Sequence, residues 1–199
     1  HERKAKVLCE LLSVGCSNDA YDLVAPEPNG RGAELALRRA LTHGGVRSDQ
    51  IDHINAHGTG TPLNDAAEAR ALRAVFGDTH HRRVCSIKGA VGHAMGAASA
   101  IEAVATVLAI NHGAIAATVG FETPDENTKT VGVSSLTINA PISVAVSSSF
   151  GFGGNNAVAM FGHEGTGNPR HLCSPVYVRG WATAPIDFDE KAVLGKGYR

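Results

Sequence analysis

The chain has 199 residues, of which 43% are hydrophobic, and it carries 18 basic and 19 acidic side chains. This composition is ordinary for a globular protein of one domain, or of one domain with an extension. The near-zero net charge gives no electrostatic reason to expect binding to a nucleic acid or a membrane surface. We identify no signal peptide and no uninterrupted apolar run of about 18 residues, so we expect no membrane span.

The first predicted elements alternate between strand and helix. Residues 5–17 are apolar with small side chains and predict a strand, and residues 18–32 form a polar connector with prolines and glycines. Residues 33–42 place leucine and alanine at helical spacing before a Gly-Gly pair, which predicts a helix that ends there. Residues 51–56 predict the second strand.

A second helix and a third strand follow. We expect Asn64 or Asp65 to cap this helix, Glu68 to add favourable charge to its first turn, and the helix to run to about Phe76 and stop at Gly77. Residues 83–87 predict a strand. Residues 94–111 are nearly apolar on all sides and predict a long helix buried between sheets.

The remaining core is mostly extended. Residues 114–119 are predicted to be extended, and residues 122–139 to be a loop with weakly extended parts. Residues 142–149 and 156–161 predict two strands of a hairpin joined by a glycine-rich loop. Alternating strands and helices closed by two strands predict an α/β fold, a layered half-domain with a mixed sheet.

Three glycine-rich loops carry the candidate functional residues. The first contains His57, Thr59 and Thr61, in the sequence HGTGTP, directly after the second predicted strand. Glycines allow the backbone to approach a ligand closely, and the threonine hydroxyls can contact a polar ligand chain. Because ligands bind at the carboxyl ends of strands in open α/β sheets, we expect the three loops to converge on one site. A tight turn with a structural histidine is the alternative for this loop.

The second loop carries Lys88 and His93 after the third predicted strand. We expect the helix that begins at residue 94 to disfavour a protonated His93, and a neutral imidazole can donate to a developing oxyanion. Glu102, on the apolar helix, requires a cation if it is buried, so we expect it to pair with Lys88. The alternative is a structural Lys–Glu pair beside a core histidine.

The third loop has the sequence FGFGGNN from Phe150 to Asn156. It lacks the GK[ST] ending of a P-loop and joins two strands, so we expect it to present backbone N–H groups, with Phe150 and Phe152 lining an apolar channel. An ordinary hairpin turn is the alternative. The four cysteines form no CxxC pair and the histidines lack ligand spacings, so we expect reduced thiols and no metal site.

The ordered motifs NAHGTGTPLND, KGAVGHAMGAASAIEA and SFGFGGNNA resemble the carboxyl-terminal half of a β-ketoacyl-acyl-carrier-protein synthase, of the KAS II-like kind in the thiolase superfamily. The resemblance covers residues 1–162, and the composition changes afterwards, so residues 163–199 are interpreted as an extension or linker of unknown role. It implies a thiolase-like αβα half that is completed by an amino-terminal half not in this chain.

The resemblance also implies a role for each loop residue. His57 and His93 would promote decarboxylation of a malonyl thioester, with support from Lys88 and Glu102. The pantetheine arm would contact Thr59 and Thr61. The oxyanion hole and gate would come from Phe152 and Phe150. No cofactor is implied, because phosphopantetheine of an acyl carrier protein carries the substrates.

The chain departs from the family pattern at several positions. Asn155 stands where threonine is usual, and Asp22-Leu23-Val24 replaces the usual His-Met-Thr. The nucleophilic cysteine of the family, in a TACSS-like motif, has no counterpart here, and Cys85 is interpreted as structural. Nucleophilic attack on an acyl thioester needs an activated thiolate.

We therefore expect an acyltransferase of fatty-acid or polyketide chain elongation, inactive as an isolated chain. A Cys-bearing amino-terminal half or partner subunit would supply the nucleophile. A non-catalytic subunit resembling a chain-length factor is the alternative, which the two histidines and Lys88 disfavour. A thiolase-like hydrolase or a CoA-binding module is a third possibility, which the lack of a local nucleophile disfavours. The expected setting is a cytoplasmic dimer that works with an acyl carrier protein.

Overall fold

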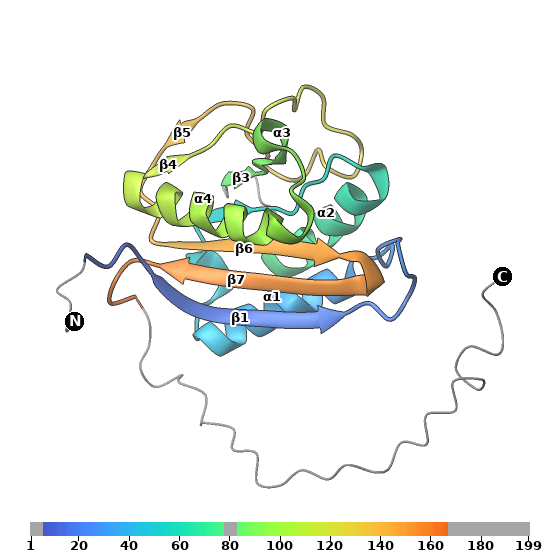
Figure 1. Cartoon of the computed structure of the whole chain (residues 1–199), viewed down its shortest axis with the longest axis horizontal. Helices are drawn as coiled ribbons and strands as arrows, with labels where there is room; N and C mark the ends of the chain where they lie inside the picture. Colours follow the sequence, from blue (N-terminus) through green and yellow to red (C-terminus); the bar gives the residue numbers. More distant parts are fainter. Residues whose placement is uncertain (1–5, 78–82, 167–199) are drawn as a thin grey trace, which may run out of the picture.

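The computed structural model describes residues 6–77 and 83–166, and it is built around a five-stranded mixed sheet. The strands lie in the order β1-β7-β6-β2-β3 (Figure 1). Their bounds are β1 Glu10–Asn18, β2 His53–Asn55, β3 Arg83–Cys85, β6 Val144–Gly151 and β7 Asn155–Gly162. Strand β2 runs parallel to β3 and β6, whereas β7 pairs antiparallel with β6 and β1. Strands β4 (Ala114–Ile115) and β5 (Ile138–Asn139) form a separate small sheet.

Helices cover both faces of the large sheet, which gives the chain two hydrophobic cores. Helices α1 (Arg31–Gly44) and α2 (Pro62–Phe76) pack on one face, where Val144 and Val146 of β6 join the first core. Helix α4 (Ala98–His112) packs on the other face, where Ala145 joins the second core. Successive residues of a strand point to opposite faces, so β6 contributes to both cores. The predicted layered α/β fold with a mixed sheet is therefore confirmed.

The helix boundaries correct two details of the sequence-based prediction. Helix α2 begins at Pro62 with Thr61 at its N-cap position, so neither Asn64 nor Asp65 is the capping residue. Proline suits the first helical position because its fixed φ is helical and its missing N–H would have no partner there. Glu68 consequently lies beyond the first turn, where it is buried, and Asp65 is the acidic residue of that turn, so the predicted first-turn role of Glu68 is wrong.

Helix α4 also begins later than predicted, at Ala98 rather than at residue 94. The short helix α3 (Lys88–Val91) and a 3-10 turn (Met95–Ala97) precede it, and Gly92 between them has a φ of 75°. Glycine adopts this left-handed backbone conformation without a Cβ clash, so the chain turns here before the long helix begins.

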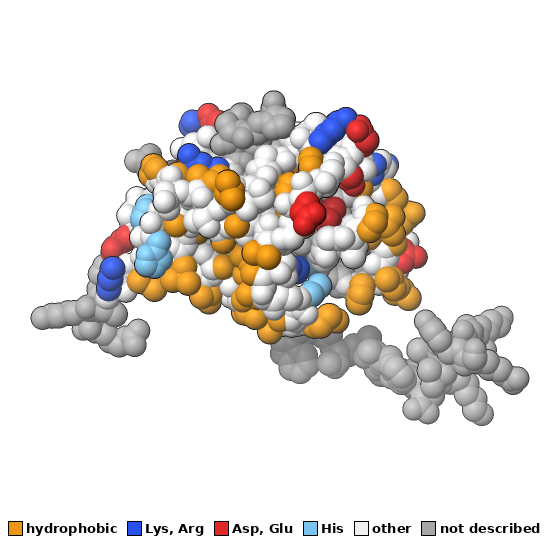
Figure 2. All heavy atoms as spheres, turned by 90° about the horizontal axis from the view of Figure 1, so that it is seen from above, with side chains coloured by type: hydrophobic (Ala, Val, Ile, Leu, Met, Phe, Trp, Pro, Cys, Tyr) orange, Lys and Arg blue, Asp and Glu red, His pale blue; other side chains and the backbone are white. Residues whose placement is uncertain are grey.

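Only one side of α4 is buried, whereas the sequence predicted burial on all sides. Ile101, Val104 and Leu108 on its outer side are 39%, 59% and 47% exposed. Figure 2 shows hydrophobic side chains spread over the side of the molecule on which α4 lies. By length and composition alone, the segment Met95–His112 could cross a membrane, contrary to our sequence-based expectation. In the fold, however, this helix covers a sheet and carries the buried Glu102.

The remaining elements follow the predicted order with shifted ends. Helix α1 is longer than predicted and lies between Gly30 and Gly45, which have φ values of 70° and 62°. The hairpin of β6 and β7 is confirmed, and its turn contains Phe152–Gly154. Residues 1–5 and most of the predicted extension, including Cys173, lie outside the described residues, so the proposed division at residue 162 stays a prediction.

Candidate functional site

The carboxyl ends of β2, β3 and β6 bring the three glycine-rich loops together, as the sequence predicted. The Lys88 Nζ atom lies 2.6 Å from the backbone oxygen of His57 and 3.3 Å from its Nδ1 atom. The ring centroid of His57 lies 5.6 Å from that of His93 and 5.4 Å from that of Phe150. Because β2 is parallel to both β3 and β6, all three strands end at the same edge of the sheet.

The predicted pair between Lys88 and Glu102 is present and buried. The Lys88 ammonium donates to the Glu102 carboxylate, and the two residues are 7% and 2% exposed. Burial raises the pKa of Glu102, and the hydrogen bond and charge of Lys88 partly offset that rise. Asn55, the last residue of β2, donates to the backbone oxygen of Glu102 at 3.0 Å and so ties α4 to the sheet.

His57 is neutral at physiological pH. Burial, followed by the positive charge of Lys88 and the neighbouring His93, lowers the pKa of His57 to about 3. The Lys88 ammonium has only donors to offer, so the His57 Nδ1 atom accepts and its proton resides on Nε2. His57 therefore presents an N–H donor from its Nε2 atom.

Glu68 is a site residue that the sequence analysis did not identify in this role. Its two carboxylate oxygens accept from the backbone N–H groups of His57 and Gly58, each at 2.8 Å. Burial raises the pKa of Glu68 to about 7, and these hydrogen bonds partly offset that rise. A signal was available, because Glu68 shares the buried helical spacing of Ala71, Leu72 and Val75. A carboxylate on an apolar helix face needs a nearby donor.

His93 lies in an exposed loop between α3 and α4 rather than at a helix start, so the reasoning from the helix dipole was wrong. Its Nδ1 atom accepts from the backbone N–H of Met95 at 3.2 Å. In its neutral form His93 therefore also carries its proton on Nε2, as His57 does. The two imidazoles lie edge to face, with an interplanar angle of 84°.

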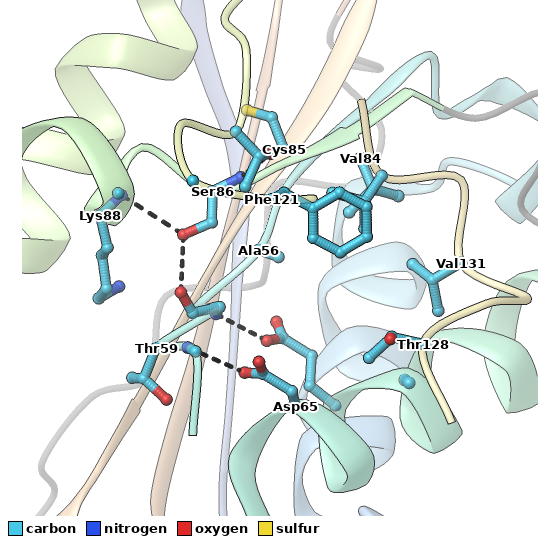
Figure 3. A pocket seen from close by; sticks show the side chains of 18 of the residues that line it. Ala56, Thr59, Asp65, Val84, Cys85, Ser86, Lys88, Phe121, Thr128 and Val131 are labelled. Carbon is cyan, nitrogen blue, oxygen red and sulfur yellow. Dashed lines mark hydrogen bonds between the residues drawn. The ribbon is translucent and has the colours of Figure 1, made fainter. Parts of the chain in front are cut away.

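Two cavities flank the loop that carries His57. A cleft of about 780 Å³ is lined by residues of all three loops: His57, Thr59, Thr61, His93, Phe150 and Phe152. The Thr59 and Thr61 hydroxyls lie 2.8 Å apart, and Phe152 is 68% exposed at the cleft. Behind the loop, a smaller cavity of about 270 Å³ is lined by Lys88, Ser86 and Asp65 among others (Figure 3). Ser86 donates to the backbone oxygen of Gly58, and Asp65 accepts from the backbone N–H of Gly60. The walls of this second cavity therefore hold the loop that carries His57.

None of the cysteines at positions 9, 16 and 85, which are the ones in the described part of the chain, is placed as an activated nucleophile. Burial, followed by the charge of Glu102, raises the pKa of Cys85 to about 12, so its thiol stays protonated. Its Sγ atom lies 3.8 Å from the Nε2 atom of the buried His53. Cys9 and Cys16 belong to the region of β1, which β7 and β6 separate from β2. The structural role predicted for Cys85 fits this geometry.

The sequence matches one protein family over residues 8–122, described as the beta-ketoacyl synthase, C-terminal domain. A mitochondrial 3-oxoacyl-[acyl-carrier-protein] synthase of Arabidopsis thaliana is 42% identical over 163 residues, or 80% of this chain and 35% of the relative. The 3-oxoacyl-[acyl-carrier-protein] synthase 2 of Synechocystis is 39% identical, over 80% of this chain and 38% of the relative. The chain thus spans less than half the length of these relatives.

Two solved structures share the fold with similar coverage. The ishigamide ketosynthase/chain length factor matches with a TM-score of 0.78 and 39% identity, over 82% of this chain and 40% of that one. A type II polyketide synthase acyl-carrier protein in complex with its ketosynthase, bound to a hexaketide, matches with a TM-score of 0.78 and 29% identity, over 81% and 40% of the two chains. These similarities confirm the predicted thiolase-like half.

Proposed function

Because the chain belongs to the β-ketoacyl synthase family, as its carboxyl-terminal domain, we propose that it supplies the decarboxylating half of a 3-oxoacyl-acyl-carrier-protein synthase. The complete enzyme would join a malonyl thioester to an acyl thioester in fatty-acid or polyketide chain elongation. The observation that supports this proposal is the cluster of His57, His93 and Lys88 at one edge of the sheet.

The cluster suits the loss of CO2 from a malonyl group. When the bond between the carboxylate and the α-carbon breaks, its electron pair moves into the thioester carbonyl and forms an enolate. The Nε2–H groups of His57 and neutral His93 donate to that developing oxyanion. Lys88 holds the His57 tautomer, Glu102 holds Lys88, and Glu68 fixes the backbone of the His57 loop. The enolate carbon then attacks the acyl thioester carbonyl, and the thiolate of the acyl-enzyme leaves.

The threonine pair and the third loop complete the proposed assignment. Thr59 and Thr61 line the large cleft and would contact the pantetheine arm of an acyl carrier protein, which carries both substrates and replaces a resident cofactor. The backbone N–H of Phe152 would contribute to the oxyanion hole for acyl transfer, and the rings of Phe150 and Phe152 would line the acyl entrance. One of the similar solved structures is itself a complex of an acyl-carrier protein with its ketosynthase.

A second half would supply the nucleophilic cysteine. The exposed side of α4, with Ile101, Val104 and Leu108, supports this, because a helix with apolar residues on both sides needs a second layer. We place that layer in the amino-terminal half, either on the same polypeptide or on a partner subunit, and we propose that the complete enzyme is a dimer. A non-catalytic chain-length-factor-like subunit is the rival assignment, since similar solved structures contain such factors.

One measurement distinguishes the catalytic assignment from the non-catalytic subunit. The protein is produced with its amino-terminal half, and CO2 release from malonyl-acyl carrier protein is measured in the wild type and in His57→Ala. We expect CO2 release by the wild type and its loss in the variant, because His57 donates to the enolate. Equal and negligible release by both proteins would reject the catalytic assignment and favour the scaffold.

A further inference from the structure

The turn between β6 and β7 is built from residues that cannot hold its shape by side-chain packing. Gly153 and Gly154 have φ values of 78° and 73°, and Phe152, which precedes them, is largely exposed. Two consecutive glycines have many backbone conformations in the unfolded chain, so holding both in the left-handed region costs a large conformational entropy. Hydrogen bonds from neighbouring residues therefore have to fix this turn.

Asn155 provides one of these hydrogen bonds from a rigid base. It is the first residue of β7 and pairs in register with Gly151 of β6 and Asn18 of β1, so strands hold its backbone on both sides. Its Nδ2 atom donates to the backbone oxygen of Phe152 at 3.0 Å. Its Oδ1 atom accepts from the Nδ2 atom of Asn18 at 3.3 Å. One amide thus connects the Phe152 carbonyl to the end of β1.

The peptide group between Phe152 and Gly153 is fixed at both ends. Asn155 binds its oxygen, and the Gly153 N–H donates to the backbone oxygen of Leu23 at 2.8 Å. Asn18 also donates to the backbone oxygen of Gly153 at 2.8 Å. Since the sheet holds Gly151 on one side and this peptide is fixed on the other, both backbone dihedral angles of Phe152 are restrained. We call the contacts of Asn155 with Phe152 and Asn18 the Asn155 brace.

We propose that Asn155 is a positioning residue that aims the Phe152 N–H and ring into the cleft through this brace; the role in catalysis rests on the function proposed above. Asn155 acts through Phe152, which we assign to acyl transfer. Within the described residues no hydrogen bond joins Asn155 to His57, His93 or Lys88. Loss of the brace therefore slows acyl transfer to the nucleophilic cysteine and leaves decarboxylation unchanged.

The test uses Asn155→Asp in the protein produced with its amino-terminal half. This change keeps the shape and the acceptor of the side chain but replaces its N–H donor by an oxygen that faces the Phe152 carbonyl. Asn139→Asp is the matched control, since it makes the same chemical change at an exposed asparagine whose side chain makes no hydrogen bond in the described part of the chain. Asn18→Ala removes the other end of the brace and serves as a second variant.

Three quantities are measured: acyl loading, CO2 release from malonyl-acyl carrier protein, and amide hydrogen exchange of the peptide that contains Gly153. Losing the one hydrogen bond to the Phe152 carbonyl predicts a loading rate about 3- to 10-fold lower in Asn155→Asp. Asn18→Ala loses its hydrogen bonds to Asn155 and to the Gly153 carbonyl, so its loading rate should fall at least as far. We expect Gly153 exchange to be faster by a similar factor after correction for intrinsic rates, with unchanged CO2 release and no effect in Asn139→Asp.

Equal losses of loading and CO2 release would overturn the inference, because a general disturbance of the site lowers both. Unchanged exchange at Gly153 would also overturn it, because the brace would then not hold the turn. If the wild type neither loads acyl groups nor releases CO2, the proposed function fails, while the exchange measurement still decides whether the Asn155 brace exists.

Discussion

The ion pair of Lys88 and Glu102 allows the stability of the fold to be separated from the chemistry of the site. Lys88→Met removes the cation but keeps an unbranched side chain of similar length. It leaves the Glu102 carboxylate, 2% exposed, without the ammonium group that donates to its Oε1 atom. The Oε2 atom of Glu102 already has no hydrogen-bond partner among the described residues. Removing one partner of a buried pair costs about 3–5 kcal/mol of the free energy of unfolding.

The double variant Lys88→Met/Glu102→Leu should recover much of this loss. Replacing a buried ion pair by apolar side chains of similar volume is often neutral for stability. One deficit remains, because the backbone oxygen of His57 loses the donor that lies 2.6 Å away in the wild type. An unsatisfied buried acceptor costs about 1–3 kcal/mol, and both variants carry this cost. They differ in the unpaired Glu102 carboxylate, so the double variant should be about 3–5 kcal/mol more stable than Lys88→Met.

Activity should not recover with stability. Both variants lose the charged donor to the His57 Nδ1 atom, which selects the tautomer that presents Nε2–H. A hydrogen bond to a charged group contributes about 1.5–3 kcal/mol, so CO2 release should fall about 10- to 150-fold in each variant.

The assay combines urea unfolding at pH 5 and pH 8 with CO2 release, in the protein produced with its amino-terminal half. Burial already raises the pKa of Glu102, and loss of Lys88 raises it further, so Glu102 protonates more readily in the folded variant. The destabilisation by Lys88→Met should therefore be smaller at pH 5 than at pH 8. If Lys88→Met released CO2 at the wild-type rate, the proposed role of Lys88 would be refuted. A double variant with a free energy of unfolding as low as that of Lys88→Met would refute the ion-pair argument.

Three further predictions follow from other residues. His93→Ala should lower CO2 release about 100- to 1000-fold, the effect of losing one oxyanion donor, while radiolabelled acyl loading stays near the wild-type rate; the reverse pattern would contradict the assigned role. Folding raises the pKa of Glu68 from 4.5 to about 7, so its contribution to the free energy of unfolding falls as the pH rises through that range, and Glu68→Gln should remove this part of the slope in urea titrations. An unchanged slope would show that Glu68 does not titrate there. Val104→Asp on the exposed side of α4 should weaken co-purification with the amino-terminal half, with Arg47→Asp, at an exposed position after α1, as the control. Equal recovery of both variants would argue against that interface.

The residue pattern by itself determined the order of the elements and the convergence of the three loops. Strand–helix alternation requires parallel pairing, and parallel strands end at the same edge, so His57, Lys88 and Phe150 had to meet once β2, β3 and β6 were adjacent. The partner of Lys88 was predictable for a similar reason, because Glu102 on an apolar helix has to find a cation.

The tertiary structure decided what local patterns could not encode. The start of α4 was misplaced because residues 94–97 are individually compatible with a helix, yet the chain turns at Gly92 and Met95, both with positive φ. The role of Glu68 required knowing that the His57 loop lies over α2 with two backbone N–H groups directed at that carboxylate. Burial of α4 on one side only likewise depends on which layers surround it, and hydrophobicity along the sequence cannot tell which protein surface will cover the other side.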